Sequence, residues 1–540
     1  MNTQHNQKRG QGFNAIHLNF FEFPTEDPER LEVYCYTDQI SYAPGQTVIF
    51  HTSTTGTQYD IEVIRDGVEP QLVHEIRGLA GFLHKTPVDA PVKGCAWPEA
   101  CRWVIPDDVL SGGYLVRTVA RSDRGDEVVH YHFFAVRAAR PGAGLLLVCA
   151  TGTWVAYNDW GGASHYEGNV EGADINRMSP VLSLQRPWAT GQVWLPVGVP
   201  RIPRVEAPEI GAIPRYPNLE FAYAMGYSKY YASAGWASYE RHFLLWAERN
   251  GIAADVATQL DLQFRPEMLA GYDCVVFVGH DEYWSAEQRD AVDAYVDQGG
   301  NVARFGGNFI WQVRIEDEGR TQVCYKYFAE ELDEVGKQQP EKMTCAWDYA
   351  PLRRPGAATF GLTGTSACYT GLGGFCPRSA KGFTVYRPEH WIFDETDLYY
   401  GDTFGSEARI FAYEVDGVEF TFRDGLPYPT FTDGAPDTLE ILAMAPATNA
   451  EEDHGNPGTR LYAGEADWHF LCHMRYGEVN EENLARSRGG AGMIGVFTRN
   501  GGTVVNAGSV EWVNGLRLRD PVTEQVTLNV IRRFTQREAK

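Results

Sequence analysis

The sequence predicts an α/β protein in which a parallel-sheet core with a β-rich insertion follows an N-terminal immunoglobulin-like β-sandwich. Three observations support this: short strand-like segments near the start, alternating strand and helix patterns after Gly144, and Gly- and aromatic-rich sequence from about residue 324 to 438. The chain has 540 residues. Since single cores stop growing at roughly 250–300 residues, we expect two or three domains.

The first domain is expected at residues 29–140, after a polar N-terminal tail at residues 1–28. Its strand-like segments are rich in β-branched and aromatic residues and are separated by Gly, Pro and Asp turns. They are Leu31–Tyr36, Thr47–His51, Tyr59–Ile64, Gly113–Ala120 and Val128–Val136. This pattern is typical of an antiparallel sandwich. No clustering of His or carboxylate residues indicates chemistry here, so we expect a structural or oligomerising role.

The second domain is expected at residues 143–540, after a linker rich in Pro and Gly. The apolar run Leu145–Ala150 predicts its first strand, and Ala232–Asn250 has the pattern of a helix. The end of the chain predicts a hairpin, Gly492–Phe497 with Gly502–Asn506, and a last helix over Val522–Glu538.

A β-α-β unit is predicted in the middle of this domain. Tyr272–Gly279 has the pattern of a buried strand, Ser285–Asp297 that of a helix with Ser285 as its N-cap, and Asn301–Phe305 that of the next strand. Such a unit implies a parallel sheet. In open α/β sheets ligands bind beyond the carboxyl ends of the strands. The residues after Ala150, Gly279 and Phe305 are therefore the places to look for a site.

Composition and charge exclude several classes of function. Hydrophobic residues make up 44% and aromatic residues 13% of the chain, which is typical of a globular protein. Lys and Arg number 47 against 71 Asp and Glu, for a formal charge of −24. A surface this acidic repels nucleic acid and anionic membranes. With no membrane-span or signal-peptide pattern, we expect a cytoplasmic protein.

The ten cysteines include no C-x-x-C pair, which argues against a zinc ribbon or a thioredoxin-like site. Cys95 with Cys101 and Cys368 with Cys376 are near enough in sequence to pair in an oxidising compartment. We expect buried or incidental free thiols instead, because free cysteine behaves as a small hydrophobe.

Polar residues follow two of the predicted strands. In Gly279-His280-Asp281-Glu282, the alternation of an extended segment puts His280 and Glu282 on the same side. After the next strand, Gly306-Gly307-Asn308 allows close approach of a ligand, and Asn308 offers a donor and an acceptor. A solvated loop before a capped helix and a plain Gly-Gly turn are the structural alternatives. Neither loop has a dinucleotide or P-loop fingerprint.

The first strand runs into an aromatic, Gly-rich segment that we expect to be a loop in the same cleft. It contains Tyr157 and Tyr166. Most buried tyrosines pack and form one hydrogen bond, so the phenols alone do not establish a metal site.

Taken together, these motifs resemble the N,N-dimethylformamidase large (β) subunit family, in its C-terminal catalytic part. The matching stretches are Ala156-Tyr157-Asn158, Ser164-His165-Tyr166-Glu167, Ser179-Pro180, Arg186-Pro187, Gly279-His280-Asp281-Glu282-Tyr283-Trp284-Ser285 and Gly306-Gly307-Asn308-Phe309-Ile310-Trp311. A weaker likeness extends to Gly508-Ser509-Val510-Glu511-Trp512, so the resemblance covers most of the chain after about residue 144. It implies a glutamine-amidotransferase-like α/β core.

The resemblance also implies a mononuclear iron held by Tyr157, Tyr166 and Glu282. Phenolate and carboxylate are hard oxygen donors that suit Fe(III), and a phenol with a pKa of about 10 needs the metal to deprotonate it. In the family the two tyrosines lie farther apart than the nine positions here. The first phenolate ligand is therefore open between Tyr157 and rival phenols downstream: Tyr223, Tyr227, Tyr230, Tyr231 and Tyr239.

The implied activity is hydrolysis of the C–N bond of a small N-alkyl or N,N-dialkyl amide, with iron as a Lewis acid on the carbonyl and on water. By the same resemblance Glu414 is the catalytic glutamate, and a surface carboxylate is the alternative. His280 and Asn308 would orient water, substrate or the developing oxyanion. Asp453 and His454 belong to a solvated loop or to the entrance of the site.

Two other classes of protein are alternatives to an iron-dependent hydrolase. A cysteine amidotransferase lacks support because neither strand-end loop contains a cysteine. A non-catalytic carbohydrate- or protein-binding module on a degenerate fold is the remaining alternative, and bound iron distinguishes it from a hydrolase. We expect a homo-oligomer, and a small partner subunit, as in the resembling enzyme, is a further option.

Overall fold

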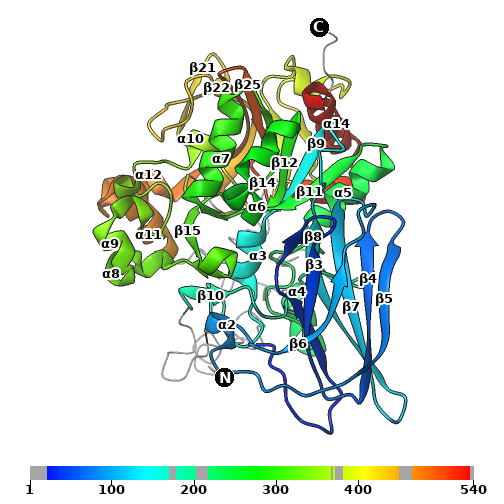
Figure 1. The fold of residues 1–540 in the computed structure, drawn as a ribbon. Helices are drawn as coiled ribbons and strands as arrows, with labels where there is room; N and C mark the ends of the chain where they lie inside the picture. Colours follow the sequence, from blue (N-terminus) through cyan, green and yellow to red (C-terminus); the bar gives the residue numbers. More distant parts are fainter. Residues whose placement is uncertain are drawn as a thin grey trace.

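Buried apolar runs form strands and amphipathic segments form helices in the computed structural model (Figure 1). It describes residues 21–168, 178–201, 217–366, 369–370, 381–448 and 465–535. Among these residues, none of the helices combines the length and hydropathy that a bilayer crossing requires. Of the cysteines, eight lie in these ranges and are free, and Cys368 and Cys376 lie outside them.

Two sheets make up the N-terminal region (Figure 1). One has the strand order β1-β3-β6 and the other β2-β8-β7-β4-β5. The strands are β1 (Val33–Thr37), β2 (Ser41–Tyr42), β3 (Thr47–Thr54), β4 (Gln58–Asp66), β5 (Gln71–Ala80), β6 (Glu99–Val104), β7 (Gly112–Arg121) and β8 (Glu127–Val136). A shared apolar core joins them, with Phe50 from the first sheet and Val116 and Phe134 from the second.

All five strand segments expected in this region are strands, but β2, β5 and β6 were not anticipated. β5 and β6 lie at sheet edges and are largely exposed, so they lack the apolar alternation that marks a half-buried strand. The pairing is antiparallel except between β2 and β8, which run parallel.

The largest sheet has eleven strands, and its main path runs β11-β9-β12-β14-β25-β24-β23-β17-β20. Its strands are β9 (Leu145–Cys149), β11 (Ala254–Thr258), β12 (Cys274–His280), β14 (Asn301–Gly307), β17 (Tyr369–Thr370), β18 (Phe383–Val385), β19 (Thr403–Phe404), β20 (Tyr413–Glu414), β23 (Glu440–Thr448), β24 (Gly489–Arg499) and β25 (Gly502–Asn506). The stretch from β11 to β25 is parallel, and β24 and β23 add antiparallel strands. The sheet is therefore mixed.

The predicted β-α-β unit is confirmed. Between the parallel strands β12 and β14 runs α7 (Ala286–Asp297). The side chain of its N-cap, Ser285, accepts a hydrogen bond from the backbone N–H of Gln288, and the Gln288 side-chain oxygen accepts one from the backbone N–H of Ser285. The predicted final hairpin is also present as β24 and β25.

Two expectations about helices were wrong. The helix expected over Ala232–Asn250 begins only at Glu240, because Gly235 has a φ of +111° and a Cβ there would lie 2.1 Å from the Gln192 carbonyl oxygen. The segment after Ala150, expected as a loop, starts with a short buried helix that carries Tyr157. The α-helices in and near the core are α2 (Ala90–Lys93), α3 (Thr151–Tyr157), α4 (Pro217–Met225), α5 (Glu240–Arg249), α6 (Gln259–Phe264), α13 (Trp512–Leu518) and α14 (Pro521–Thr535).

The region from residue 324 to 438 is helical in its first part and has strands of two to four residues in its second. The remaining helices are α8 (Ala329–Leu332), α9 (Glu334–Gln338), α10 (Ala357–Phe360), α11 (Glu465–Tyr476) and α12 (Glu481–Arg488), with 3-10 turns at Pro266–Gly271, Asp317–Gly319, Lys326–Phe328, Pro340–Lys342, Ala350–Leu352 and Trp391–Phe393. The remaining strands are β10 (Val181–Ser183), β13 (Tyr283–Ser285), β15 (Trp311–Glu316), β16 (Thr321–Val323), β21 (Phe420–Arg423) and β22 (Leu426–Pro429). β20 brings part of this region to the edge of the large sheet.

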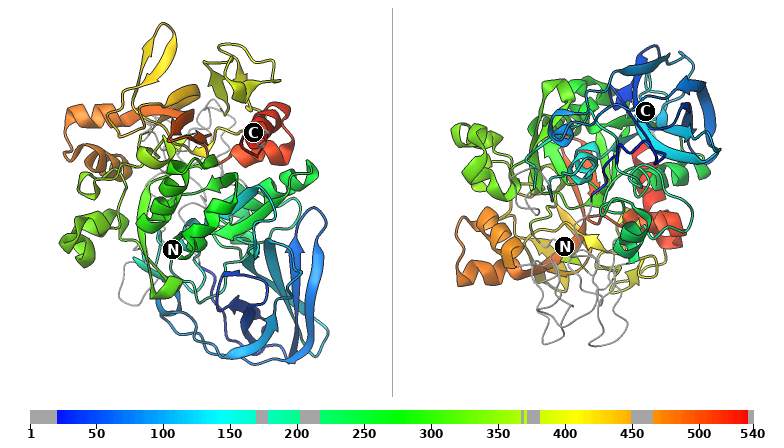
Figure 2. Two further views of the ribbon diagram at one scale, coloured as in Figure 1. Left: turned by 45° about the horizontal axis from the view of Figure 1, so that its top comes forward. Right: turned by 90° about the horizontal axis from the view of Figure 1, so that it is seen from below.

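The N-terminal sheets lie against one end of the α/β region (Figure 2). Buried polar contacts join the two parts. Arg137 forms an ion pair with Asp261 at 3.1 Å, and the Ser41 hydroxyl donates to the same carboxylate at 2.7 Å. Asp66 binds Arg241 through both carboxylate oxygens.

Candidate active site

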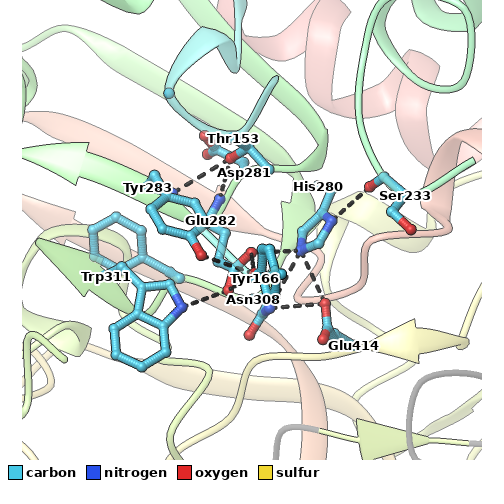
Figure 3. Close-up of polar contacts among 12 residues, drawn as sticks. Thr153, Tyr166, Ser233, His280, Asp281, Glu282, Tyr283, Asn308, Trp311 and Glu414 are labelled. Atoms are coloured by element: carbon cyan, nitrogen blue, oxygen red, sulfur yellow. Dashed lines mark hydrogen bonds and ion pairs between the residues drawn. The ribbon is translucent and has the colours of Figure 1, made fainter. Parts of the chain in front are cut away.

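The polar residues predicted from the strand ends lie close together, in the place expected for a ligand site in an α/β sheet (Figure 3). The parallel register pairs His280 of β12 with Gly307 of β14, so the loops that carry Glu282 and Asn308 emerge side by side. β20 supplies Glu414 from more than one hundred residues further along the chain (Figure 3).

Glu282 is the centre of the first group of contacts. The Tyr166 hydroxyl lies 3.0 Å from Oε1 and 2.9 Å from Oε2 of this carboxylate, and the indole N–H of Trp311 donates to Oε1 at 2.6 Å. The backbone N–H of Glu282 donates to the Thr153 hydroxyl at 2.9 Å. The carboxylate is buried and its position is fixed from several sides.

Tyr166 is surrounded by aromatic rings and one cation. Its hydroxyl accepts a hydrogen bond from Tyr283 at 2.8 Å, and its ring centroid lies 4.3 Å from that of Tyr157. The Lys326 ammonium lies 3.5 Å from the centroid of the Tyr166 ring. Tyr157 in turn shares a hydrogen bond with Tyr413.

Burial raises the pKa of both Tyr157 and Tyr166 well above the usual range, and the charge of Glu282 raises them further. Both phenols are therefore neutral at ordinary pH in the absence of a bound metal ion. A metal ion is the kind of group that would reverse this, because coordination to phenolate supplies the free energy for deprotonation.

His280, Asn308 and Glu414 form the second group of contacts. His280 Nε2 lies 2.9 Å from Glu414 Oε2 and 3.1 Å from Glu282 Oε2, as the expected alternation of His280 and Glu282 requires. The Asn308 side-chain amide donates to Glu414 Oε2 at 2.8 Å. His280 Nδ1 lies 2.7 Å from the Ser233 carbonyl oxygen, which only accepts, so Nδ1 carries a hydrogen.

Opposing effects act on the imidazole. Burial alone would lower the pKa of His280, but the charges and hydrogen bonds of Glu414 and Glu282 raise it to about 10. Burial raises the pKa of Glu414, while the His280 charge opposes that shift. The imidazole is therefore held protonated between two carboxylates.

Strained backbone holds two residues of the site. Asn308 and Tyr413 have φ values of +65° and +67°, in the left-handed region that bulky residues avoid. Close packing requires Gly307 beside Asn308, since a Cβ there would lie 2.7 Å from the backbone nitrogen of Val510. Such strain persists only where the surrounding structure determines it, and it is concentrated at functional sites.

A buried ionic network lies directly beneath the site. Arg304 is fully buried and forms ion pairs with Asp281, at 3.0 Å, and with Asp416. Asp416 also accepts from the backbone N–H of Phe309 at 2.9 Å. The network ties the His280–Glu282 loop, the Asn308 loop and the segment after Glu414 to one cation.

Replacing Arg304 by Met is expected to lower the free energy of unfolding by about 3–5 kcal/mol, because Asp281 and Asp416 would remain buried without their counter-ion. Chemical denaturation followed by fluorescence measures the change. The control is Arg102→Met, which removes an exposed ion pair with Glu99 and should leave stability unchanged. A loss no larger than that of the control would show that the network does not hold the site together.

Comparison with known proteins gives a family for the chain. Residues 61–526 match the family model described as N,N-dimethylformamidase beta subunit-like, C-terminal. The chain belongs to this family. The resemblance drawn from the motifs is thus confirmed, and the match begins earlier than residue 144, inside the N-terminal sheets. No curated protein matches the chain.

Several solved structures match a small part of this chain. Spo0M, a sporulation control protein from Bacillus subtilis, is 14% identical over 20% of this chain and 49% of its own, with a TM-score of 0.15. Murine CRIg is 10% identical over 20% of this chain and 99% of its own, with a TM-score of 0.15. A third match is a chain from a structure on T cell activation by the bacterial superantigen toxic shock syndrome toxin-1. It is 13% identical over 20% of this chain and 99% of its own, with a TM-score of 0.14. Likenesses this weak carry no argument about function.

Most rival phenols of this dimethylformamidase-like chain lie away from Glu282. Tyr223 is exposed on α4, and Tyr227 packs against Tyr231, whose hydroxyl binds the Pro200 carbonyl oxygen. The Tyr239 hydroxyl is 3.2 Å from Glu511. Tyr230 is the nearest rival, with its ring centroid 5.7 Å from that of Tyr166.

For the iron site that the family resemblance implies, replacing Tyr166 by Phe is expected to lower the affinity for iron by about 10–100-fold or more, because the hydroxyl that contacts the Glu282 carboxylate is lost. The visible band of the iron-loaded protein should lose a large part of its intensity. Tyr230→Phe is the matched control and should leave both unchanged. The opposite pattern would make Tyr230 the phenolate ligand. Titration with iron followed by absorbance measures both variants.

The donor set at the site fits an oxygen-ligated metal. Among the described residues, no group of three or more His, Cys, Asp or Glu side chains is arranged to hold a metal ion, so a metal here would depend on the phenols. The Tyr166 hydroxyl is hydrogen-bonded to both Glu282 oxygens at 2.9–3.0 Å, so a phenol and a carboxylate, both hard oxygen donors once deprotonated, meet at one point.

Several residues of the site were not identified from the sequence, although some stand in the quoted motifs. They are Thr153, Tyr283, Trp311, Lys326 and Tyr413. Tyr283 and Trp311 follow the two strand ends directly, and that position was a usable signal. Lys326 and Tyr413 reach the site only through tertiary packing. Asp453 and His454 lie outside the described residues.

Proposed function

We propose that the protein is an iron-dependent hydrolase of linear amides that cleaves the C–N bond of a small N-alkyl or N,N-dialkyl amide, such as dimethylformamide or a related compound. The observation that carries the proposal is the direct contact of the Tyr166 hydroxyl with both oxygens of Glu282, beside the bonded group of His280, Asn308 and Glu414. Membership of a dimethylformamidase-like family supports the same reaction class.

Tyr157, Tyr166 and Glu282 would hold the iron. Two phenolates and one carboxylate carry three negative charges, which favour Fe(III) over softer or less charged ions. Bound there, iron would act as a Lewis acid on the amide carbonyl and on water. The Lys326 ammonium above the Tyr166 ring adds a positive charge that favours the phenolate form.

Glu414 is the group that moves protons. Its carboxylate accepts a proton from the attacking water as the new C–O bond forms at the carbonyl carbon. The same carboxyl group then delivers the proton to the amide nitrogen as the C–N bond breaks, releasing an amine and a carboxylic acid. Burial raises the pKa of Glu414 above its usual value, while the charge of His280 opposes that shift.

His280 and Asn308 orient Glu414. Both donate toward Glu414 Oε2, at 2.9 and 2.8 Å, so the other carboxylate oxygen is the one available for water. Because His280 is itself fixed by Ser233, this pair keeps the carboxylate in one rotamer. A positive imidazolium at this position also stabilises negative charge that develops on the substrate oxygen.

Finer features of the fold and assembly belong to the same proposal. We infer that the large sheet is a glutamine-amidotransferase-like core, since its parallel strands carry the site at their carboxyl ends, and that the N-terminal sheets are an immunoglobulin-like sandwich. The family's description as a beta subunit supports a partner subunit.

Assays on a panel of amides test the activity. Iron-loaded protein is expected to release amine from N-alkyl and N,N-dialkyl formamides and acetamides, and protein stripped by a chelator should regain activity on addition of iron. Hydrolysis that is equally fast in the iron-free protein would overturn the proposal. So would the absence of amine release from every amide in the panel by protein that retains iron.

A further inference from the structure

A cavity lies outside the candidate active site, and its lining includes none of the residues of that site. It has a volume of ≈ 600 Å³ and is bounded by residues 194–201, by α5 and by Arg517 of α13. This volume is within the range of about 300–1,000 Å³ found for ligand pockets. Trp194, Leu195 and Leu245 give it an apolar wall, and Trp194 is held in place by stacking on Tyr131 at 4.4 Å.

Four arginines line the cavity, in a chain whose formal charge is −24. Two have carboxylate partners. Arg241 is bound by Asp66 at 2.6 and 3.1 Å, and Arg201 lies 3.4 Å from Glu511.

The other two arginines form no ion pair with a described residue, although the charge of Glu511 acts on Arg517. Arg517 donates to the neutral side-chain oxygen of Asn514, at 2.9 and 3.0 Å. Arg249, at the end of α5, forms no ion pair with any described residue. The cavity therefore carries a net positive charge of the kind that draws in anions.

This positive charge lowers the pKa values of titratable groups that line the cavity. Burial and the charge of Arg201 lower the pKa of Arg517 to about 10. Burial and the charges of Arg201, Arg517 and Arg241 lower the pKa of His242 well below its usual range. Within the described part of the chain, His242 Nε2 is buried and has no hydrogen-bond partner. A bound anion would relieve the repulsion among the cations.

We propose that this cavity is a binding site for a small organic anion, a carboxylate or a phosphate ester, that is separate from the amide-hydrolysing site. Arg517 and Arg249 bind the anionic group, for which guanidinium is suited by its charge and forked donors. The apolar part of the ligand packs against Trp194, Leu195 and Leu245.

One tyrosine separates the two sites. The Arg201 guanidinium lies 5.4 Å from the centroid of the Tyr239 ring, and the His280 ring makes an edge-type contact with Tyr239 at a centroid distance of 6.5 Å. A Cβ on Gly279 would lie 2.3 Å from Tyr239, so the tyrosine fills the space between them. A ligand in the cavity is therefore distinct from a substrate at Glu282, and its binding can be measured in inactive protein.

The test uses 4-fluorobenzoate as the probe and follows the broadening of its fluorine NMR signal by the full-length protein. Because a carboxylate can also bind iron, the measurement is made on the Glu282→Gln variant as well as on the wild type. We expect broadening in both, and none with the neutral analogue 4-fluorobenzyl alcohol. Displacement by inorganic phosphate would indicate a phosphate ester as the ligand, and lack of displacement a carboxylate, both within the proposal.

The decisive comparison is between the wild type, Arg249→Gln and the double variant Arg249→Gln/Arg517→Gln. Loss of charge-assisted contacts should weaken binding of the probe about tenfold or more in the double variant. The factor should be smaller in Arg249→Gln, because Arg249 is exposed. Arg124→Gln, an exposed arginine of the N-terminal sheets, is the matched control and should bind as the wild type does. The proposal is overturned if the arginine variants bind with unchanged affinity, or if broadening disappears in Glu282→Gln.

Discussion

Replacing Glu282 by Gln is expected to remove iron from the protein and with it the colour and the activity. The substitution keeps the shape of the side chain but deletes the charge that the proposed ligand set needs. It also puts an amide group against the donors Trp311 and Tyr166, so the contacts at 2.6 and 2.9 Å are no longer all favourable. Since loss of even an outer contact lowers metal affinity by about 10–100-fold, we expect at least about 100-fold here.

Elemental analysis after dialysis against a chelator measures this effect. Glu287→Gln, an exposed change in the first turn of α7, is the control and should keep iron as the wild type does. Circular dichroism checks that the fold is retained. Iron bound as tightly in Glu282→Gln as in the control would mean that another carboxylate holds the metal.

The Glu414→Gln variant is expected to keep its iron and to lose most of its turnover. Glutamine can still accept from Asn308 and His280, so the local structure is preserved, but it cannot take up the proton of water. Removal of a general acid–base group lowers kcat by about 10²–10⁴-fold, and KM should change much less because the carbonyl contacts remain.

Steady-state kinetics on an amide from the reactive panel, with iron content measured on the same sample, separate the two roles. The contrast with Glu282→Gln is the internal control: one variant loses metal, and the other loses turnover while retaining metal. If kcat of Glu414→Gln falls by less than a few-fold, the proton acceptor is a different group.

Local patterns were sufficient for the unit that holds the centre of the site. Apolar runs and the Ser285 cap define β12, α7 and β14, and alternation across an extended segment put His280 beside Glu282. These signals depend on residues within a few positions of one another, which is why the sequence contains them.

Tertiary contacts account for what the sequence did not yield. Glu414 lies on a strand of two residues whose neighbour, Tyr413, has a positive φ, so no periodic pattern marks it, and it was identified through family resemblance alone. The sequence could not show which tyrosines point toward Glu282, because the orientation of each ring depends on packing against distant segments. α5 began later than expected since the approach of Gly235 to Gln192 overrides local helical preference.

The most direct test of the iron site is elemental analysis of the purified protein combined with its visible absorption spectrum. The proposed ligands predict about one iron per chain and a charge-transfer band from tyrosinate bound to Fe(III), which weakens in Tyr166→Phe and is lost in Glu282→Gln. Colourless, iron-free protein that hydrolyses amides at full rate would contradict the site proposed at Tyr157, Tyr166 and Glu282.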